Sequence, residues 1–495
     1  MAIEHDRSHT FDLLARAGAA GTAAEERAAA FDSLAQLEDY RSIEPLTAMV
    51  TDSGLPDEIR RRASEVVAGF DDTTTGAIRR TWWAGGDPIV QRHALGLMTR
   101  TEADIVTPVA ADDAHPFQVI ALGAMVFDFG EASFMPILIR ALRHQDPKIR
   151  WTAARNLLWS EPVAAEDGLL AAAHDADREV AAAALDTLRY YPTRRVLRTM
   201  AELRDHGDEK VRAAATDSFA ELSSSFEEAV SDAEKLPLLR DWLRPTGNLI
   251  DLRAPESDET TAAPPGPRRL PKRHALPEST LLALLDDLDG DWLSRDSTLR
   301  TVNWKAFTPD ERARLTVRLT SHPDPLIREI AGAALSEWSD TDALMELTRD
   351  LSYSVRKATV YHLASVPPDP AVADFAWQYL STATGVSAQE ALRTYLAHKS
   401  GNGVLEQLVD IARTDAREDV RYEAIHDLVD LQAANEIRAL TPLLDEPPGV
   451  SWALHLALLD GLRNLELQIT PPAHLATIDN LDLAYSLAKL TVARN

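Results

Sequence analysis

One eight-residue stretch contains the pattern from which the fold is predicted: Asp146-Pro147-Lys148-Ile149-Arg150-Trp151-Thr152-Ala153. Its aspartate can cap a helix, because the carboxylate accepts hydrogen bonds from free backbone N–H groups, and its proline suits the first helical turn. Ile149, Ala153 and Leu157 follow one another at four-residue intervals and form an apolar stripe on one helical face. The stretch therefore predicts the start of an amphipathic helix.

The same pattern recurs along most of the chain with a period near thirty residues, and such repetition predicts a repeat architecture. Close copies begin at Asp208 and Asp324, and weaker copies begin at Asp87 and Asp177. The apolar residue that corresponds to Ile149 recurs every 27 to 34 residues. It occupies positions 59, 90, 117, 149, 180 and 211, then 299, 327, 355, 386, 420 and 450, of which 386 and 450 are the weakest members.

Each repeat also contains a second apolar stripe upstream of this helix, such as the one from Phe134 to Leu142. We interpret each unit as a helix, a tight turn that contains Asp, and a second helix. A single helix pair cannot bury its apolar faces, whereas a stack of neighbouring pairs forms a continuous core. The sequence predicts an all-α fold, an α-solenoid of stacked antiparallel helix pairs in two arrays.

These units resemble HEAT repeats, specifically the short form of about thirty residues whose second helix reads D-x-x-[VI]-R-x-x-A. The resemblance covers nearly the whole chain except one linker, and it implies a scaffold or adaptor protein. It also implies that the arginine of the motif faces acidic groups of adjacent repeats, because stacked repeats need pairs at their interfaces. This structural ladder comprises Arg60, Arg150, Arg212, Arg300, Arg328, Arg356 and Arg421.

The periodicity stops between residues 245 and 277, where the segment 262–267 reads Ala-Ala-Pro-Pro-Gly-Pro. We expect an N-terminal array over residues 1–244, a Pro-rich disordered linker over 245–277 and a C-terminal array over 278–495. The linker holds a dense basic cluster, which is either a docking motif for an acidic partner or a solvated run on the protein's own acidic surface. The cluster consists of Arg268, Arg269, Lys272 and Arg273.

The composition excludes several classes of function. The 495 residues contain 51 Lys and Arg against 78 Asp and Glu, a net charge of −27, and no Cys, so disulfides and thiolate chemistry are excluded. The charge argues against binding to nucleic acid and against docking on anionic lipid, since both need a basic face. With 43 Arg but only 8 Lys, and 46 Asp against 32 Glu, the surface resembles that of a halophilic archaeal protein, although a high-GC genome alone also favours Arg over Lys.

Nothing in the sequence indicates a membrane or an exported protein. Residues 1–10 are polar and precede no apolar core of a signal peptide, and no run of 18 uncharged apolar residues occurs. We therefore expect a cytoplasmic protein.

Four histidines recur at the expected turns, at intervals of 29, 30 and 32 residues: His115, His144, His174 and His206. Stacked repeats would place them along one edge, where a metal-binding or proton-sensing role is conceivable. Adjacent helices lie about 10 Å apart, however, which is too far for shared ligation. No metal ion and no cofactor is assigned.

Trp82 and Trp83 are adjacent near the end of an expected first helix. Two neighbouring residues cannot both face the core side of a helix, so one of them should be partly exposed. An exposed Trp is a suitable anchor for a protein partner, although it could equally cover the core of the neighbouring repeat.

Signatures of catalysis are missing from the sequence: no Gly-rich phosphate loop, no Gly-x-Ser-x-Gly and no His-Glu-x-x-His occurs. DNA glycosylases built from HEAT-like repeats need a positively charged groove, which this composition does not supply. We predict a non-enzymatic scaffold or adaptor that presents a curved acidic solenoid surface to protein partners, in complex assembly or signalling. The alternative is an accessory protein similar to the phycobilin lyases, which binds a small molecule in its concave groove.

Overall fold

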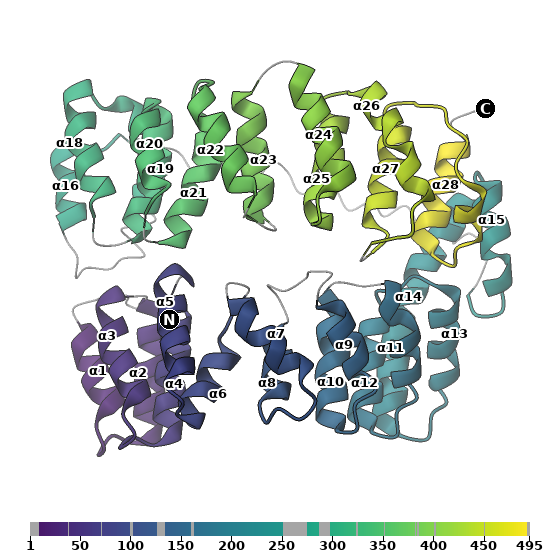
Figure 1. Cartoon of the computed structure of the whole chain (residues 1–495), viewed down its shortest axis with the longest axis horizontal. Helices are drawn as coiled ribbons and strands as arrows, with labels where there is room; N and C mark the ends of the chain where they lie inside the picture. The colour runs from purple at the N-terminus through teal and green to yellow at the C-terminus, as the bar shows by residue number, and fades with distance from the viewer. Residues whose placement is uncertain are drawn as a thin grey trace. The chain divides into compact units, whose positions relative to one another are not determined.

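The computed structural model confirms the all-α fold, because every regular element among the described residues is a helix (Figure 1). The structure describes residues 9–37, 39–70, 72–99, 102–125, 134–159, 163–250, 275–286, 298–322, 325–350, 352–381, 383, 386–399, 402–449 and 451–492.

The chain divides into two compact units, and each unit combines two separate segments of the sequence. Unit 1 comprises residues 1–102 and 262–400. Its α-helices are α1 (Thr10–Gly18), α2 (Ala24–Leu37), α3 (Ile43–Thr51), α4 (Asp57–Ala68), α5 (Asp72–Ala84), α6 (Pro88–Gly96), α16 (Glu278–Asp286), α18 (Pro309–Thr320), α19 (Pro325–Trp338), α20 (Thr341–Leu347), α21 (Tyr353–Leu363), α22 (Pro370–Leu380) and α23 (Val386–His398). Short 3-10 helices span Tyr40–Ser42 and Trp304–Ala306.

Unit 2 comprises residues 103–261 and 401–495. Its α-helices are α7 (Ala103–Ala111), α8 (Gln118–Ala124), α9 (Met135–Ala141), α10 (Pro147–Asn156), α11 (Glu166–Ala172), α12 (Arg178–Leu188), α13 (Arg194–Leu203), α14 (Glu209–Ala233), α15 (Pro237–Leu243), α24 (Asn402–Thr414), α25 (Glu418–Asp430), α26 (Ala434–Ala439), α27 (Ala453–Asn464) and α28 (Leu481–Val492). Its 3-10 helices span Leu157–Trp159, Val163–Ala165, Arg244–Thr246, Thr441–Asp445 and Ala473–Thr477.

Successive helices pack as pairs, for example α3 with α4, α11 with α12 and α22 with α23. The second helix of a repeat also packs on second helices of its neighbours, as α10 does on both α8 and α12. A small residue permits this close approach of two helices. The alanines of the motif are accordingly fully buried: Ala63, Ala94, Ala121, Ala153, Ala184, Ala215, Ala331 and Ala424.

The predicted helix caps are confirmed. The carboxylate of Asp87 accepts a hydrogen bond from the backbone N–H of Ile89 at 2.9 Å, and Asp146 accepts one from Lys148 at 2.8 Å. Asp177 and Asp208 cap α12 and α14 in the same way. Each cap starts a second helix at the position that the repeat predicts.

The repeat at Leu299 differs from the prediction. A helical segment ends at Arg300, and the chain then forms the 3-10 helix Trp304–Ala306 before α18 begins. The start of α18 is fixed by a capping box, in which Thr308 and Glu311 each satisfy the backbone N–H of the other. So few residues separate Arg300 from this cap that a second helix of ordinary length has no room.

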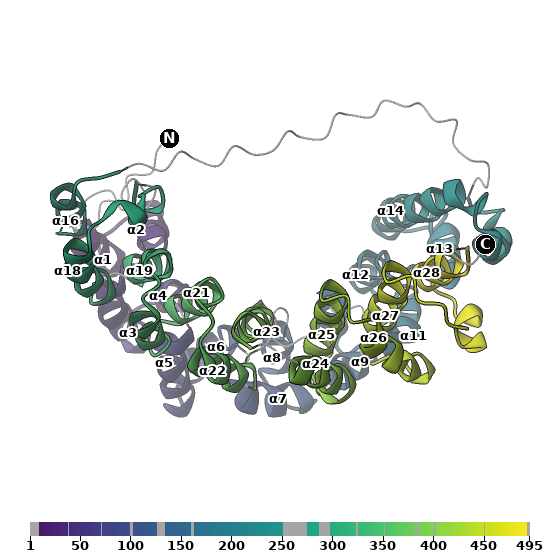
Figure 2. The ribbon, with the colours of Figure 1, turned by 90° about the horizontal axis from the view of Figure 1, so that it is seen from above.

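In unit 2, the C-terminal helix α28, which Figure 2 shows from above, packs against α15 (Figure 1). The indole nitrogen of Trp242 on α15 donates a hydrogen bond to the carbonyl of Ile478 at 3.2 Å, and the N–H of Leu481 donates to the carbonyl of Pro192 at 2.8 Å. Segments that lie more than two hundred residues apart in the sequence thus share one core. The repeat pattern did not predict this contact.

Candidate functional site

The turn between the two helices of a repeat contains a side chain that accepts a backbone hydrogen bond. The Nδ1 atom of His144 accepts from the N–H of Asp146 at 3.0 Å, and Nδ1 of His206 accepts from the N–H of Asp208 at 3.1 Å. Asp175 fills the same role two residues before its own helix cap, at 2.8 Å from the N–H of Asp177. The recurrence of histidine at the turns therefore has a structural cause that sequence reasoning missed.

The other two turn histidines differ from each other. His115 Nδ1 accepts from the N–H of Phe117 at 3.1 Å, whereas His174 is exposed and lies one residue before the acceptor Asp175. Within the described ranges, no group of three or more His, Asp or Glu side chains is arranged to hold a metal ion.

The motif arginines pair with acidic groups of the following repeat at several places. Arg150 donates to both carboxylate oxygens of Asp175, at 2.7 and 2.8 Å, and Arg60 reaches Asp87 at 2.7 Å. Arg328 makes the same two-bonded pair with Asp350, at 2.7 and 2.9 Å. Longer pairs at 3.6 and 3.9 Å join Arg300 to Glu329 and Arg421 to Glu446.

The same arginines also close the end of the preceding helix. Four of them donate to the backbone carbonyl six residues upstream, a group that the helix itself leaves without a partner. These bonds run from Arg150 to His144 at 2.8 Å, from Arg212 to His206 at 2.7 Å, from Arg328 to His322 at 2.8 Å and from Arg356 to Asp350 at 2.7 Å. These four bonds hold the turns before the second helices, and Arg150 and Arg328 also bind the next repeat through Asp175 and Asp350. Arg60 and Arg421 donate instead to the carbonyls of Val50 and Ala412.

Among three neighbouring repeats of unit 2, the turn acceptor differs with the preceding ladder residue, whereas Arg60 is followed by Gly85 and pairs with the cap Asp87 itself. Where the ladder residue is Arg150, the acceptor in the next repeat is Asp175. Where it is Gln118 or Ala181, the acceptor is His144 or His206. Burial raises the pKa of Asp175, but the hydrogen bonds from Arg150 and from the N–H of Asp177 outweigh it, so this pKa lies below its usual value.

The tryptophan pair is divided as expected. Trp82 is only 3% exposed and belongs to the core, whereas Trp83 is partly exposed. The backbone carbonyl of Trp83 accepts a hydrogen bond from Gln91 at 2.8 Å, which fixes the end of α5 against α6. Of the two, Trp83 is the residue that a partner can reach.

The basic cluster Arg268, Arg269, Lys272 and Arg273 lies outside the described residues. The first part of the expected linker, residues 245–250, is described: it contains the 3-10 helix Arg244–Thr246 and the buried side chains of Thr246 and Ile250.

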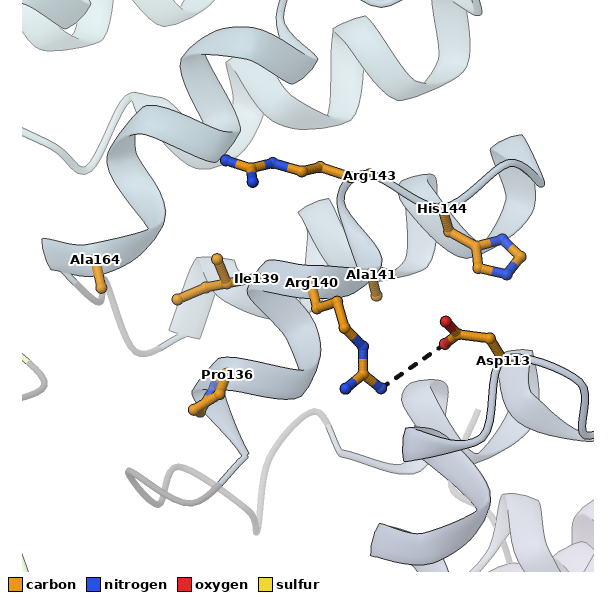
Figure 3. Close-up of a pocket in the computed structure, with 8 residues that line it drawn as sticks. All are labelled: Asp113, Pro136, Ile139, Arg140, Ala141, Arg143, His144 and Ala164. Atoms are coloured by element: carbon orange, nitrogen blue, oxygen red, sulfur yellow. Dashed lines mark ion pairs between the residues drawn. The ribbon is translucent and has the colours of Figure 1, made fainter.

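A surface groove of about 570 Å3 lies over α9 (Figure 3). Pro136, Ile139 and Ala141 contribute apolar surface, and the side chains of Arg140 and Arg143 lie on either side of Ile139. Arg140 is 3.7 Å from the carboxylate of Asp113 and donates to a backbone carbonyl at 2.7 Å.

The positive charge of this groove is only partly balanced. The guanidinium of Arg143 is exposed and forms no ion pair or hydrogen bond with the described residues, whereas Arg140 shares Asp113 with the amide of Gln118. A guanidinium of this kind can bind a carboxylate with two parallel hydrogen bonds. The groove is therefore suited to an acidic group attached to an apolar one, and the sequence pattern did not single it out.

No helix in the described part of the chain combines the length and the apolar character that crossing a bilayer requires.

No protein-family model matches this chain, and no curated protein matches it. Similar solved structures include a chain from the structure that describes Kap95p binding to RanGDP, with 11% identity and a TM-score of 0.31 over 98% of this chain and 66% of that one. A chain of the Kap95:Nup1 complex has 13% identity and a TM-score of 0.29, over 93% of this chain and 67% of that one. A chain of the structure of Kap121p bound to the SUMO protease Ulp1p has 13% identity and a TM-score of 0.26, over 92% of this chain and 53% of that one. This chain thus spans between about half and two thirds of the length of those chains.

Proposed function

We propose that this protein is a non-enzymatic scaffold or adaptor that binds other proteins, in the assembly or signalling of cytoplasmic complexes. The proposal rests on the structural role of the recurring polar residues. The Arg ladder and the turn acceptors are engaged in caps, turns and contacts between repeats, for example in the pair of Arg150 with Asp175. The repeated part of the sequence thus builds a frame, and a frame of stacked helices acts through the surface that it presents.

Three surfaces are proposed as contacts for partners. Trp83 offers a partly exposed aromatic anchor, and the groove with Arg140 and Arg143 offers cations beside apolar surface. The basic cluster between residues 268 and 273 is proposed as a docking motif for an acidic partner. Elsewhere the net charge of −27 repels other acidic proteins, which limits non-specific association.

The phycobilin-lyase-like alternative requires a closed apolar pocket with converging polar groups. The groove over α9 is open to solvent and is bordered by charged side chains, which favours the scaffold.

The proposal is tested by affinity capture from a lysate of the source cells at their own salt concentration, followed by mass spectrometry. Replacing residues 251–274 by a Gly-Ser segment of equal length spares the buried Ile250 and removes the basic cluster. We expect one or two stoichiometric protein partners, and loss of at least one of them in the replacement variant. A partner-free protein that carries a coloured or other small-molecule ligand would contradict the scaffold.

Trp83→Ala tests the aromatic contact, with Trp377→Ala as the matched control, since Trp377 on α22 is 37% exposed. Loss of a partner in the first variant alone supports Trp83 as an anchor, and equal retention in both removes it from the proposal.

A further inference from the structure

A second pocket, of about 330 Å3, lies where three segments of unit 2 meet. Its walls come from the chain around Tyr190–Thr193 between α12 and α13, from the start of α27 at Trp452, and from residues 478–482 before and within α28. Glu166 at the start of α11 completes it. The N–H of Leu481 donates to the carbonyl of Pro192 and so joins two of these segments directly, while Trp242 of α15 also holds Ile478 in place.

One carboxylate of this pocket is fully occupied by the protein itself. Asp479 pairs with the guanidinium of Arg194 at 2.6 Å and accepts hydrogen bonds from the backbone N–H groups of Arg194 and Arg195, at 3.2 and 3.3 Å. It therefore caps the N-terminus of α13 from a distant part of the sequence. Arg195, which also lines the pocket, is paired with Asp167 at 2.6 Å. The charges of these four side chains balance one another.

Two carboxylates remain without a full counter-charge. Glu166 accepts a hydrogen bond from the hydroxyl of Thr193 at 3.0 Å, and the nearest guanidinium, that of Arg195, lies 3.9 Å away. The carboxylate of Asp482 forms no ion pair or hydrogen bond with the described residues, and this side chain is exposed to solvent. Burial among protein atoms raises the pKa of Glu166 and that of Asp482 above their usual values. A cation in the pocket would therefore gain one partly buried counter-charge, Glu166, and a second, exposed one, Asp482.

An aromatic ring and a buried amide lie beside these carboxylates. Trp452 lines the pocket, and its indole ring can contact a cation through its face. Asn480 is only 7% exposed, and its Oδ1 accepts from the N–H of Leu483 at 3.0 Å. Its amide nitrogen makes no hydrogen bond with the part of the chain that the structure describes. This nitrogen can donate to a carbonyl group of a molecule in the pocket.

We propose that this pocket binds a Lys or Arg side chain of a protein partner, with Glu166 and Asp482 as counter-charges and Trp452 as the aromatic wall. Asn480 donates to a backbone carbonyl of the same partner. The inference rests on the proposed scaffold function and adds to it the chemistry of one contact. An anionic occupant fits less well, because Asp479 and Asn480 already occupy the N-termini of α13 and α28.

The test measures the binding of a fluorescein-labelled nine-residue peptide of alternating Gly and Lys to the full chain, by fluorescence anisotropy. About 0.5 M salt suppresses weak binding to the acidic surface at large, since the Debye length then falls well below 10 Å. The pocket variant is Glu166→Gln with Asp482→Asn. The matched control is Glu227→Gln with Glu228→Gln, which removes the same charge from an exposed face of α14.

We expect the pocket variant to bind the peptide about tenfold more weakly or worse, as for loss of a partly buried charge pair, and the control to bind like the wild type. If both variants bind the peptide equally more weakly than the wild type, the peptide is attracted only by the acidic surface at large, and the proposal is overturned. It is also overturned if the wild type does not bind the peptide. Because the pocket variant removes two uncompensated carboxylates, its thermal midpoint should equal or exceed that of the wild type. A lower midpoint would contradict the charge balance described here.

Partner capture separates this inference from the scaffold. If the wild type captures partners and the pocket variant captures the same ones equally well, the scaffold stands and the pocket proposal fails. If no partner is captured while the peptide still binds at the pocket, the scaffold fails.

Discussion

At the scale of single residues, the arginine ladder explains how the repeats hold together. Arg150 and Asp175 are 17% and 12% exposed in their side chains and share two hydrogen bonds. Lys210 and Glu179 also pair between neighbouring repeats, but both are about half exposed, at 48% and 47%. Exposed pairs contribute little to stability, whereas hydrogen bonds to charged groups away from water contribute more.

A double-mutant cycle tests this difference. Arg150→Ala, Asp175→Ala and the double variant should give a coupling free energy of about 1.5–3 kcal/mol in urea unfolding. The same cycle on Lys210 and Glu179 should give about 0–1 kcal/mol. Equal couplings for the two pairs would show that the ladder has no special structural role.

The buried alanines provide a second test at this scale. Ala153 is fully buried in α10, which packs on both α8 and α12, so a larger side chain has no space. We expect Ala153→Leu to lower the free energy of unfolding by about 1–3 kcal/mol. Ala29→Leu on the exposed face of α2 is the control and should change it little. A neutral Ala153→Leu would mean that the second helices pack more loosely than described.

The repeat pattern predicted the roles of the residues that recur in every unit. It did not predict which residues of adjacent repeats bind each other. The apolar anchors, the buried alanines and the Asp caps followed from spacing alone, as at Ile149, Ala153 and Asp146. The partner of Arg150 is Asp175 and not the cap Asp177, because the acceptor lies two residues earlier in the turn. The sequence shows this relation only locally: His144 and His206 follow Gln118 and Ala181, but Gly85 follows Arg60 and His322 follows Arg300.

At the scale of the elements, helix α25 holds the carboxylate of Asp427 in a partly buried position, where its negative charge is unfavourable. Burial, together with the nearby Glu423 and Asp430, raises the pKa of Asp427 to about 7. In the unfolded chain this group loses its proton near its ordinary value of 3.8. The folded protein therefore binds the extra proton between about pH 4 and pH 7, and its stability falls as pH rises through this window.

Asp427→Asn should remove this loss of stability at higher pH, because an amide side chain cannot ionise. We expect its thermal midpoint to exceed that of the wild type at pH 8 and to match it at pH 4, as measured by differential scanning calorimetry. Asp410→Asn on an exposed face of α24 is the control and should not change the pH dependence. A variant that tracks the wild type at both pH values would refute the raised pKa of Asp427.

The repeat pattern did not predict the elements that depend on a local helix-capping signal or on contacts between residues far apart in the sequence. The capping box of Thr308 and Glu311 starts α18 soon after Arg300 and prevents a full second helix there. Near the packing of α28 on α15, Trp242 binds Ile478 and Asp479 binds Arg194, and the partners in each pair lie more than two hundred residues apart. A repeat period records only the neighbours of each unit, so neither these contacts nor the pocket beside them could be predicted.

At the scale of the whole molecule, the net charge of −27 opposes the compact state through self-repulsion. Salt screens this repulsion, since the Debye length falls from about 10 Å at 0.1 M to about 3 Å at 1 M. We expect the thermal midpoint to rise as KCl increases from about 0.1 to 2 M, and to rise less with a neutral solute at the same concentrations. A midpoint that falls or stays constant in KCl would contradict the interpretation of the acidic surface as an adaptation to concentrated salt.

Native mass spectrometry of the protein, purified gently from its own cells, shows whether this chain binds other proteins as we propose. The chain alone has a mass of 54.4 kDa. The scaffold predicts a larger species whose added mass is one or more different polypeptides in a fixed ratio. A species at the mass of the chain alone, or at that mass plus a small molecule, would contradict the claim.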